Sequence, residues 1–262
     1  MKEQQQTLKW RVLSVVMPLG FGILVLILLQ TKIIHGLFGF TTAQLPLPLT
    51  IVKQLAANFG KVGMNAWVTV SAALFGLLLG SLLGFLSAAL TAVKPRTFGG
   101  MLPLLVAINS ISVVAMAPIM NRWFPTSFSS KAAVVTIACI GAMAVNANKG
   151  MNDLPVFSLD LMRSYASSDA TVFFRLRLPN CLPRVFIGLR TNVVTAMISA
   201  IISEFFATES RGLGYMIKTS LKIGNQKALG WAYIVAAAVV SILIYFVITF
   251  IEHRVLKSRC AE

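Results

Sequence analysis

Acidic side chains, the usual source of general acids and bases, are scarce in this chain of 262 residues. There are 8 Asp and Glu against 23 Lys and Arg, and the two histidines, His35 and His253, lie far apart. The three cysteines, Cys139, Cys181 and Cys260, lack metal-binding spacing, and no G-x-x-x-x-G-K-[ST] loop for nucleotide phosphates is present. A Ser-His-Asp, paired-carboxylate or zinc site cannot be assembled from this inventory. We therefore predict no catalytic residue, no metal and no cofactor on this chain.

Polar residues inside long apolar runs are the remaining candidates, because a bilayer makes such groups costly to keep. Glu204 lies near the end of one run, and Arg190 precedes it by roughly four helical turns, too far for a direct pair. Its carboxylate either faces headgroup water or takes part in a gate, and both hypotheses stay open. Five further residues either line a solute pathway or form hydrogen bonds between helices, and both hypotheses stay open. These are Asn109, Ser112, Met116, Asn192 and Thr195.

The elements that must position these residues are apolar segments of membrane-spanning length. The chain is 57% hydrophobic and 12% charged, whereas soluble domains carry roughly 25% charged residues. A helix needs about 20 apolar residues to cross the hydrocarbon. The sequence therefore predicts an all-α integral membrane protein with about six transmembrane helices. The six runs are Val12–Thr31, Val62–Val93, Thr97–Asn121, Ala132–Asn148, Val185–Ser203 and Ala228–Ile251.

Lys and Arg counts in the connecting segments predict the orientation. With the N-terminus in the cytoplasm, residues 1–11, 94–96, 149–184 and 252–262 hold 13 basic residues, and the segments on the other side hold 9. This bias favours both termini in the cytoplasm. The net charge of +15 is then explained by topology and lipid headgroups, without a nucleic-acid partner.

Three regions follow from these spans. Residues 1–61 comprise an N-terminal transmembrane helix and an extracytoplasmic linker. The helix is expected to be retained, since no small-x-small cleavage site follows it. The linker contains Leu45-Pro46-Leu47-Pro48, which we expect to be stiff and non-helical. Residues 62–255 form a core of five transmembrane helices with a cytoplasmic loop at 149–180, and residues 256–262 form a tail.

Small residues recur at every fourth position of the second run. On a helix they form one flat face, which lets another backbone approach closely. We predict that this face packs tightly on a neighbouring helix, most readily one of the same chain. The residues are Ala72, Gly76, Gly80, Gly84 and Ala88.

The cytoplasmic loop is too apolar for a solvated linker. Its sequence predicts one short helix from Asp160 to about Ala166 and a second from Ala170 to Leu178. Ser167-Ser168-Asp169 supplies a break and a new N-cap, and Pro179 should limit the second helix. Such a projection fills a cleft on a partner protein with its apolar side chains, or lies as an amphipathic helix on the lipid surface.

The spacing of this segment resembles the EAA loop of ABC importer permeases: E-A-A, three residues, Gly, nine residues, then I-x-L-P. Asp160 stands at the position of the Glu, Ala166 at that of the Gly, and Leu176-Arg177-Leu178-Pro179 closes the pattern. Arg163-Ser164-Tyr165 is similar to the sulfonate, taurine and nitrate branch. The resemblance covers roughly residues 45–255 and includes Ala115-Met116-Ala117-Pro118, Trp123-Phe124, Ser130-Lys131 and Gly212-Leu213-Gly214-Tyr215.

The resemblance implies a type I importer permease fold in a bacterial inner membrane, and a set of partners. The loop would dock on a cytosolic ABC ATPase, which would carry the ATP and Mg. A periplasmic or lipid-anchored substrate-binding protein, a second copy of this chain and membrane lipids are the other implied partners. The implied cargo is a small polar or anionic solute or a vitamin precursor, of the sulfonate, taurine, nitrate or thiamine-pyrimidine type. The implied coupling residues are Asp160, Leu161, Met162, Arg163, Ser164, Tyr165, Ala166, Leu176, Leu178 and Pro179.

Two points stay open at this stage. Ala166 replaces the glycine of the family pattern, so a left-handed backbone there would be strained; the turn is then helical or shifted to Ser167. An ion-coupled secondary transporter or an intramembrane enzyme is the alternative function. Secondary transporters typically have two related halves, and no second copy of the Asp160–Pro179 pattern is present.

Overall fold

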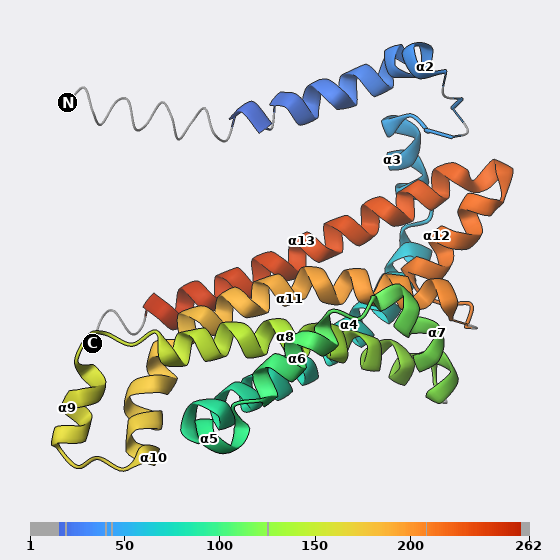
Figure 1. Ribbon diagram of the computed structural model, residues 1–262. Helices are drawn as coiled ribbons and strands as arrows, with labels where there is room; N and C mark the ends of the chain where they lie inside the picture. Colours follow the sequence, from blue (N-terminus) through green and yellow to red (C-terminus); the bar gives the residue numbers. More distant parts are fainter. Residues whose placement is uncertain are drawn as a thin grey trace, which may run out of the picture.

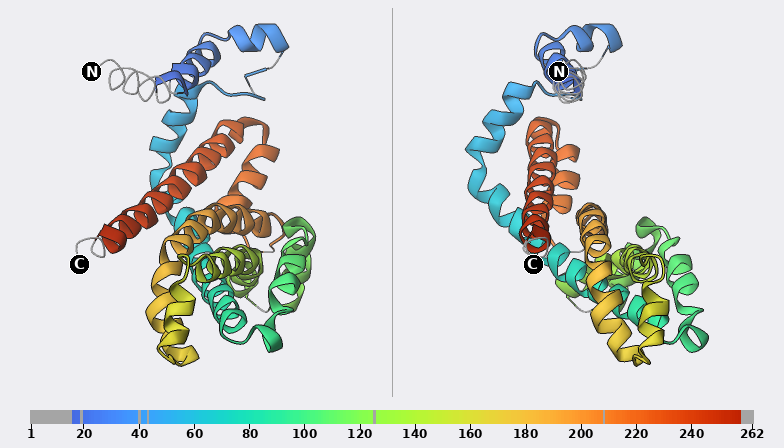
Figure 2. Two further views of the ribbon diagram at one scale, coloured as in Figure 1. Left: turned by 60° about the vertical axis from the view of Figure 1, so that its left-hand side comes forward. Right: turned by 90° about the vertical axis from the view of Figure 1, so that its left-hand side faces the viewer.

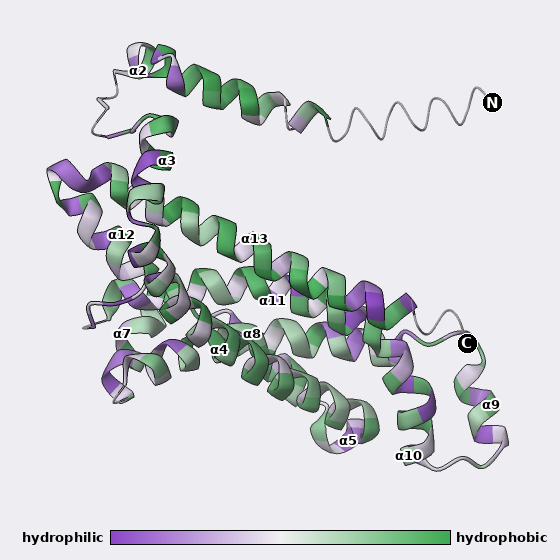
Figure 3. Ribbon diagram, turned by 180° about the vertical axis from the view of Figure 1, so that it is seen from behind, coloured by the Kyte–Doolittle hydropathy of each residue, from purple (hydrophilic) through white to green (hydrophobic). Residues whose placement is uncertain are grey.

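The computed structural model describes residues 16–18, 20–39, 41–42, 44–124, 126–207 and 209–257, and all regular structure within them is helical. Four long helices run side by side as a bundle (Figure 1). Hydrophobic residues cover the middle of the bundle and hydrophilic ones gather toward its ends (Figure 3). The predicted all-α class is confirmed. The four helices are α4 (Phe59–Val93), α8 (Ser127–Asn152), α11 (Leu178–Phe206) and α13 (Lys227–Lys257).

These long helices account for most of the predicted spans. Among the described residues, four helical stretches are long and apolar enough to cross a membrane, or five if one bent pair counts as a span. The first predicted span, Val12–Thr31, lies partly outside the described residues; its described part is helical over 16–18 and 20–30.

The third predicted span is not a straight helix. It divides into three short helices, and the chain bends by 97° before the last of them. The N–H groups of Ser110 and Ile111 bond to carbonyls three residues back, which tightens and ends one helix. Ser112 is then extended, with φ −61° and ψ 125°. The expectation of one continuous helix over Thr97–Asn121 is therefore wrong, and the bent pair is a broken span or a re-entrant loop. The pieces are α5 (Pro95–Phe98), α6 (Met101–Asn109) and α7 (Val113–Trp123).

The linker is more helical than its prolines predicted. It contains α2 (Ile33–Phe38) and α3 (Pro48–Ala57). Pro48 occupies the start of α3, where the missing N–H of proline costs nothing because that group has no partner within a helix. The expectation of a non-helical stretch thus holds only for the residues before Pro48.

The core of the bundle depends on close contact between α4 and α8. A Cβ added at Gly76 would lie 2.6 Å from the Cβ of Val135, and one at Gly80 would lie 2.5 Å from the carbonyl oxygen of Thr136. Gly84 likewise faces the backbone of Ile140. The small-residue face of α4 therefore meets α8 of the same chain.

Two short helices project from one end of the bundle (Figure 2). They are α9 (Ser158–Ser164) and α10 (Asp169–Val172), and we call them the hairpin. The end that carries them is called the hairpin end, and the opposite end, with α12 (Leu213–Lys222) and the start of α8, the distal end.

The second arm of the hairpin does not stop at Pro179. After α10 the chain forms a π-helical turn over Phe173–Arg177 and continues without a break into α11. The N–H of Leu178 bonds to the carbonyl of Phe173, five residues back. Pro179 then falls in the first turn of α11, where its missing N–H is tolerated. The predicted end of the helix at Pro179 is therefore wrong.

Candidate functional site

The first arm of the hairpin presents apolar side chains to its surroundings. Leu161 is 58% exposed and Tyr165 is 76% exposed, while Met162 is partly buried. Among the described helices, none packs closely on α9. Asp160 and Arg163 form an exposed ion pair at 3.8 Å beside these residues. The arm therefore offers an apolar patch with charges at its edge.

The turn of the hairpin is built on a left-handed residue. Ala166 has φ 49°, so the left-handed backbone falls at Ala166 and not at Ser167. Its N–H donates to the carbonyl of Arg163 at 2.9 Å, and the N–H of Ser167 donates to that of Met162 at 3.1 Å. These two bonds are those of a Schellman motif, in which glycine is preferred at the left-handed position. Ser168 then caps α10 by accepting the N–H of Thr171 at 3.3 Å, as its sequence predicted.

The second arm is anchored in the bundle. Leu178 packs against a buried cluster that includes Ala88 and Met151, and Leu176 is partly buried. The amide of Asn180 donates to the carbonyls of Gly150 and Asp153, both at 2.8 Å. Sequence reasoning missed Asn180, which ties the end of α8 to the start of α11. Displacement of the hairpin must therefore move both helices.

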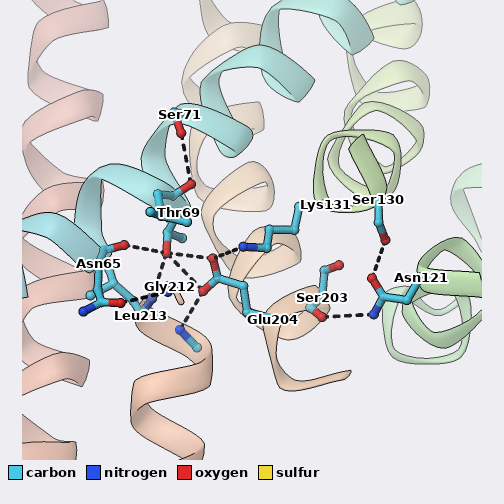
Figure 4. Close-up of polar contacts among 12 residues, drawn as sticks. Asn65, Thr69, Ser71, Asn121, Ser130, Lys131, Ser203, Glu204, Gly212 and Leu213 are labelled. Atoms are coloured by element: carbon cyan, nitrogen blue, oxygen red, sulfur yellow. Dashed lines mark hydrogen bonds and ion pairs between the residues drawn. The ribbon is translucent and has the colours of Figure 1, made fainter. Parts of the chain in front are cut away.

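A buried carboxylate lies at the distal end, in the last turns of α11 (Figure 4). Glu204 is fully buried, and its Oε1 lies 3.2 Å from Nζ of Lys131, which is 1% exposed. The hypothesis that Glu204 faces headgroup water is thus wrong. Burial of two charges costs free energy unless further hydrogen bonds satisfy them.

Those further bonds come from α4 and from the start of α12. The hydroxyl of Thr69 lies 2.9 and 3.0 Å from the two oxygens of Glu204. The same hydroxyl accepts the N–H of Leu213 at 2.9 Å, and the N–H of Gly214 donates to Glu204 at 2.7 Å. We call Thr69, Lys131, Glu204 and the N–H groups of 213 and 214 the carboxylate cluster. It joins α4, α8 and α11 to the first turn of α12.

Gly212 completes this junction. Its φ of 110° favours glycine, and a Cβ there would collide with the carboxylate of Glu204. Its N–H donates to Oδ1 of Asn65 at 2.9 Å. The chain therefore turns sharply at Gly212 and enters α12, which packs on α13, α11 and α4.

The structure does not gather the six predicted pathway residues into one site. Asn192 is buried and donates to Ser81 at 3.2 Å and to the carbonyl of Cys139 at 2.9 Å. Met116 packs in a small core cluster with Met120. The other three, apart from Glu204, are exposed or partly buried: Asn109, Ser112 and Thr195.

Sequence reasoning also missed the partners of Glu204. Lys131 directly precedes the fourth apolar run, and Thr69 lies within the second. The sequence contains one feature that could have predicted this pair: a lone Lys borders one apolar run, and a lone Glu lies near the end of another. Either charge would be costly to bury without the other.

Comparisons with known proteins agree on one family. Residues 76–257 match the family model described as binding-protein-dependent transport system inner membrane component. A probable ABC transporter permease protein of Haemophilus influenzae is 29% identical over 233 residues, which cover 88% of this chain and 94% of that protein. The formylaminopyrimidine transport permease protein ThiX of Halalkalibacterium halodurans is 31% identical over 172 residues, or 65% of this chain and 68% of ThiX.

A solved structure shows the same fold. The crystal structure of an amino acid ABC transporter with histidines superimposes with a TM-score of 0.59 at 12% identity, and covers 78% of this chain and 96% of the solved one. At this level of identity the likeness concerns the fold alone.

Proposed function

This chain belongs to the binding-protein-dependent transport system inner membrane components and is the permease subunit of an ABC importer; on that premise we propose that its hairpin is the surface on which a separate cytosolic ATPase docks. The observation that carries this proposal is the exposed apolar side of α9, with Leu161 and Tyr165 on a projecting and well-anchored element. The excess of Lys and Arg in residues 149–184 supports a position of the hairpin end in the cytoplasm.

A docking role suits the hairpin better than a place on the lipid surface. Helices that lie on a membrane bury an apolar face along the interface plane. Here α9 and α10 instead extend beyond the end of the bundle (Figures 1 and 2). Apolar side chains surrounded by charges are typical of the central anchors of protein–protein interfaces.

The second arm gives the ATPase a direct mechanical connection to the distal end. Residues Asp169–Phe206 form one helical stretch of 38 residues, about 57 Å long at 1.5 Å per residue. Glu204 lies near its far end, where the carboxylate cluster holds α12. We infer that closure of the ATPase moves this stretch and that the carboxylate cluster gates the pathway by holding or releasing α12.

The remaining parts of the transport system complete the proposal. ATP and Mg bind to the ATPase, and this chain holds no cofactor. A periplasmic or lipid-anchored binding protein delivers the solute to the distal end, and a second copy of this chain lines the other side of the pathway. The cargo is a small polar or anionic solute or a vitamin precursor.

The docking proposal is tested by introducing charge into α9. Replacing both Leu161 and Met162 with Asp should abolish co-purification of the ATPase, because two carboxylates cannot be buried in an apolar cleft without partners. Membrane insertion, checked by membrane fractionation, should be unchanged. Val156→Asp is the matched control, since Val156 is 80% exposed and lies outside α9.

Two results would contradict the proposal. One is a double variant that still retains the ATPase. The other is transport by the purified chain alone, driven by an ion gradient, which would favour a secondary transporter.

A further inference from the structure

A polar recess of about 450 Å³ opens at the distal end, between the end of α7, the first turn of α8 and the loop after α11. Two other hollows on the bundle are different in character. One of 630 Å³ beside α4, α7 and α8, and one of 480 Å³ between α4, α11 and α13, are lined almost entirely by apolar side chains. The residues of the polar recess are Asn121, Phe124, Thr126, Ser127, Ser130, Ala207 and Glu209.

The recess contains hydrogen-bonding groups that the described protein does not use fully. Oδ1 of Asn121 accepts from the hydroxyl of Ser130, and its Nδ2 makes only a long bond of 3.5 Å to the carbonyl of Ser203. A carboxamide has two N–H donors and two acceptor lone pairs, so one donor and one acceptor of Asn121 remain. The hydroxyl oxygen of Ser127 is buried and has no partner among the described residues.

The charge of the recess argues against an anion. Among the described residues that line it, Glu209 is the one with a charge, and it is exposed. Lys131, next to Ser130 in the sequence, is already paired with Glu204. The ring of Phe124 is 39% exposed and supplies a flat apolar wall, on which a planar group can stack.

We propose that this recess is a solute-binding site at the outer mouth of the permease, and that it takes small neutral or cationic solutes with adjacent hydrogen-bond donors and acceptors. This inference rests on the proposed function, which places the distal end toward the binding protein. An Asn carboxamide pairs its oxygen and nitrogen with the ring nitrogen and amino group of a heterocycle. An amide or an aminopyrimidine-like group therefore fits the recess, and a sulfonate or nitrate does not.

The recess also adjoins the carboxylate cluster. Ser130 lines it directly before Lys131, and Ser203, which accepts the hydrogen bond of Asn121, directly precedes Glu204. A bound solute thus lies next to the residues that hold α12. Binding of a solute in the recess can therefore change how the carboxylate cluster holds α12.

The test uses the purified permease–ATPase complex in lipid nanodiscs without the binding protein. Saturation-transfer NMR is recorded with aminopyrimidine and, separately, with methanesulfonate. Aminopyrimidine should bind, and Asn121→Leu and Glu209→Gln should each weaken its binding about fivefold to tenfold, the effect of one lost polar contact. Glu209→Lys should gain binding of methanesulfonate. Since Glu209 is in an exposed loop, its variants decide the question even if Asn121→Leu does not fold.

Ser71→Ala is the control. Ser71 lies on α4 and does not line the recess, and its hydroxyl bonds to the carbonyl of Val68 in its own helix. Its removal should leave aminopyrimidine binding unchanged. The inference is overturned if wild type binds neither probe, if methanesulfonate binds as well as aminopyrimidine, or if the Glu209 variants bind both probes like wild type.

Failure of this inference is distinguishable from failure of the proposed function. If the ATPase does not co-purify with the wild-type chain, the proposed function fails, while the NMR experiment on the chain alone still reports on the recess. If uptake is ATP-dependent but Glu209→Gln leaves the KM for cargo unchanged, the recess inference alone fails.

Discussion

At the scale of single residues, the distal end depends on one carboxylate. Glu204 is held by an ammonium, a hydroxyl and a backbone N–H from three other elements. Because every partner is buried with it, the loss of one partner leaves an unsatisfied charge in an apolar surrounding.

Removal of Lys131 should therefore destabilise the protein more than removal of the whole pair. Lys131→Met should cost about 3–5 kcal/mol, and Lys131→Met combined with Glu204→Gln should recover much of that loss. Thermal unfolding in detergent measures both. Lys222→Met, at an exposed lysine, should shift stability by no more than about 0.5 kcal/mol. Equal losses of stability in the single and double variants would show that the unpaired charge of Glu204 is not the cause of the destabilisation.

The left-handed Ala166 makes a second prediction at this scale. Ala166→Gly should stabilise the turn by about 0.5–1 kcal/mol, because relief of the steric cost exceeds the added flexibility of the unfolded chain. Hydrogen exchange of the Ser167 amide should slow accordingly. Ala170→Gly, in the right-handed first turn of α10, should instead speed exchange there. Faster exchange at Ser167 in Ala166→Gly would contradict the prediction.

At the scale of elements, the bundle depends on the approach of two backbones. The face of α4 that includes Gly80 meets the carbonyl oxygens of α8, so a single added methyl group must push the helices apart. Packing of this kind replaces the hydrophobic effect as the force between helices in a membrane.

The same helix contains a matched pair of glycines that tests this dependence. Gly80→Ala should destabilise by about 1–3 kcal/mol through overpacking. Gly63→Ala, where a Cβ meets nothing within 4 Å, should be neutral or stabilising by up to about 1 kcal/mol because of helix propensity. Thermal unfolding of the two variants gives the comparison. Similar melting temperatures would mean that α4 and α8 can separate freely.

At the scale of the whole molecule, the proposed ATPase contact and the proposed gate lie at opposite ends of one helical stretch. A variant that loosens the distal end should therefore leave ATPase binding intact but impair uptake. Thr69→Val keeps the shape of the side chain and removes the hydroxyl that contacts Glu204 and Leu213. We expect uptake to fall about tenfold, equivalent to about 1.4 kcal/mol.

Ser71→Ala is the control for this experiment, since the Ser71 hydroxyl bonds to the carbonyl of Val68 in its own helix and not to the carboxylate cluster. Both variants are measured for solute uptake and for co-purified ATPase. Normal uptake by Thr69→Val would exclude the carboxylate cluster from gating.

Much of this architecture could be predicted from local features of the sequence. Apolar run length located the four long helices, and the spacing of Gly76, Gly80 and Gly84 identified the face that meets α8. The cap at Ser168 followed from its residue type and position. Each of these signals lies within a few turns of one helix.

What could not be predicted depends on distant residues or on competing local preferences. Lys131 and Glu204 are on separate helices whose rotation alone decides whether they meet. The bend at Ser110–Ser112 has no proline or glycine at its centre. Pro179 usually marks the end of a helix, but the preceding π turn redirects the hydrogen bonds and lets the helix continue.

That π turn has a consequence for changes in chain length. A π turn holds one residue more than an α turn, so loss of one residue from Phe173–Arg177 can be absorbed by conversion to α-helical hydrogen bonds, with both flanks keeping their orientation. The same deletion within α11 would rotate everything beyond it by about 100° and turn Glu204 away from Lys131. The junction between hairpin and bundle is thus the place on this long helix where a one-residue deletion is absorbed locally.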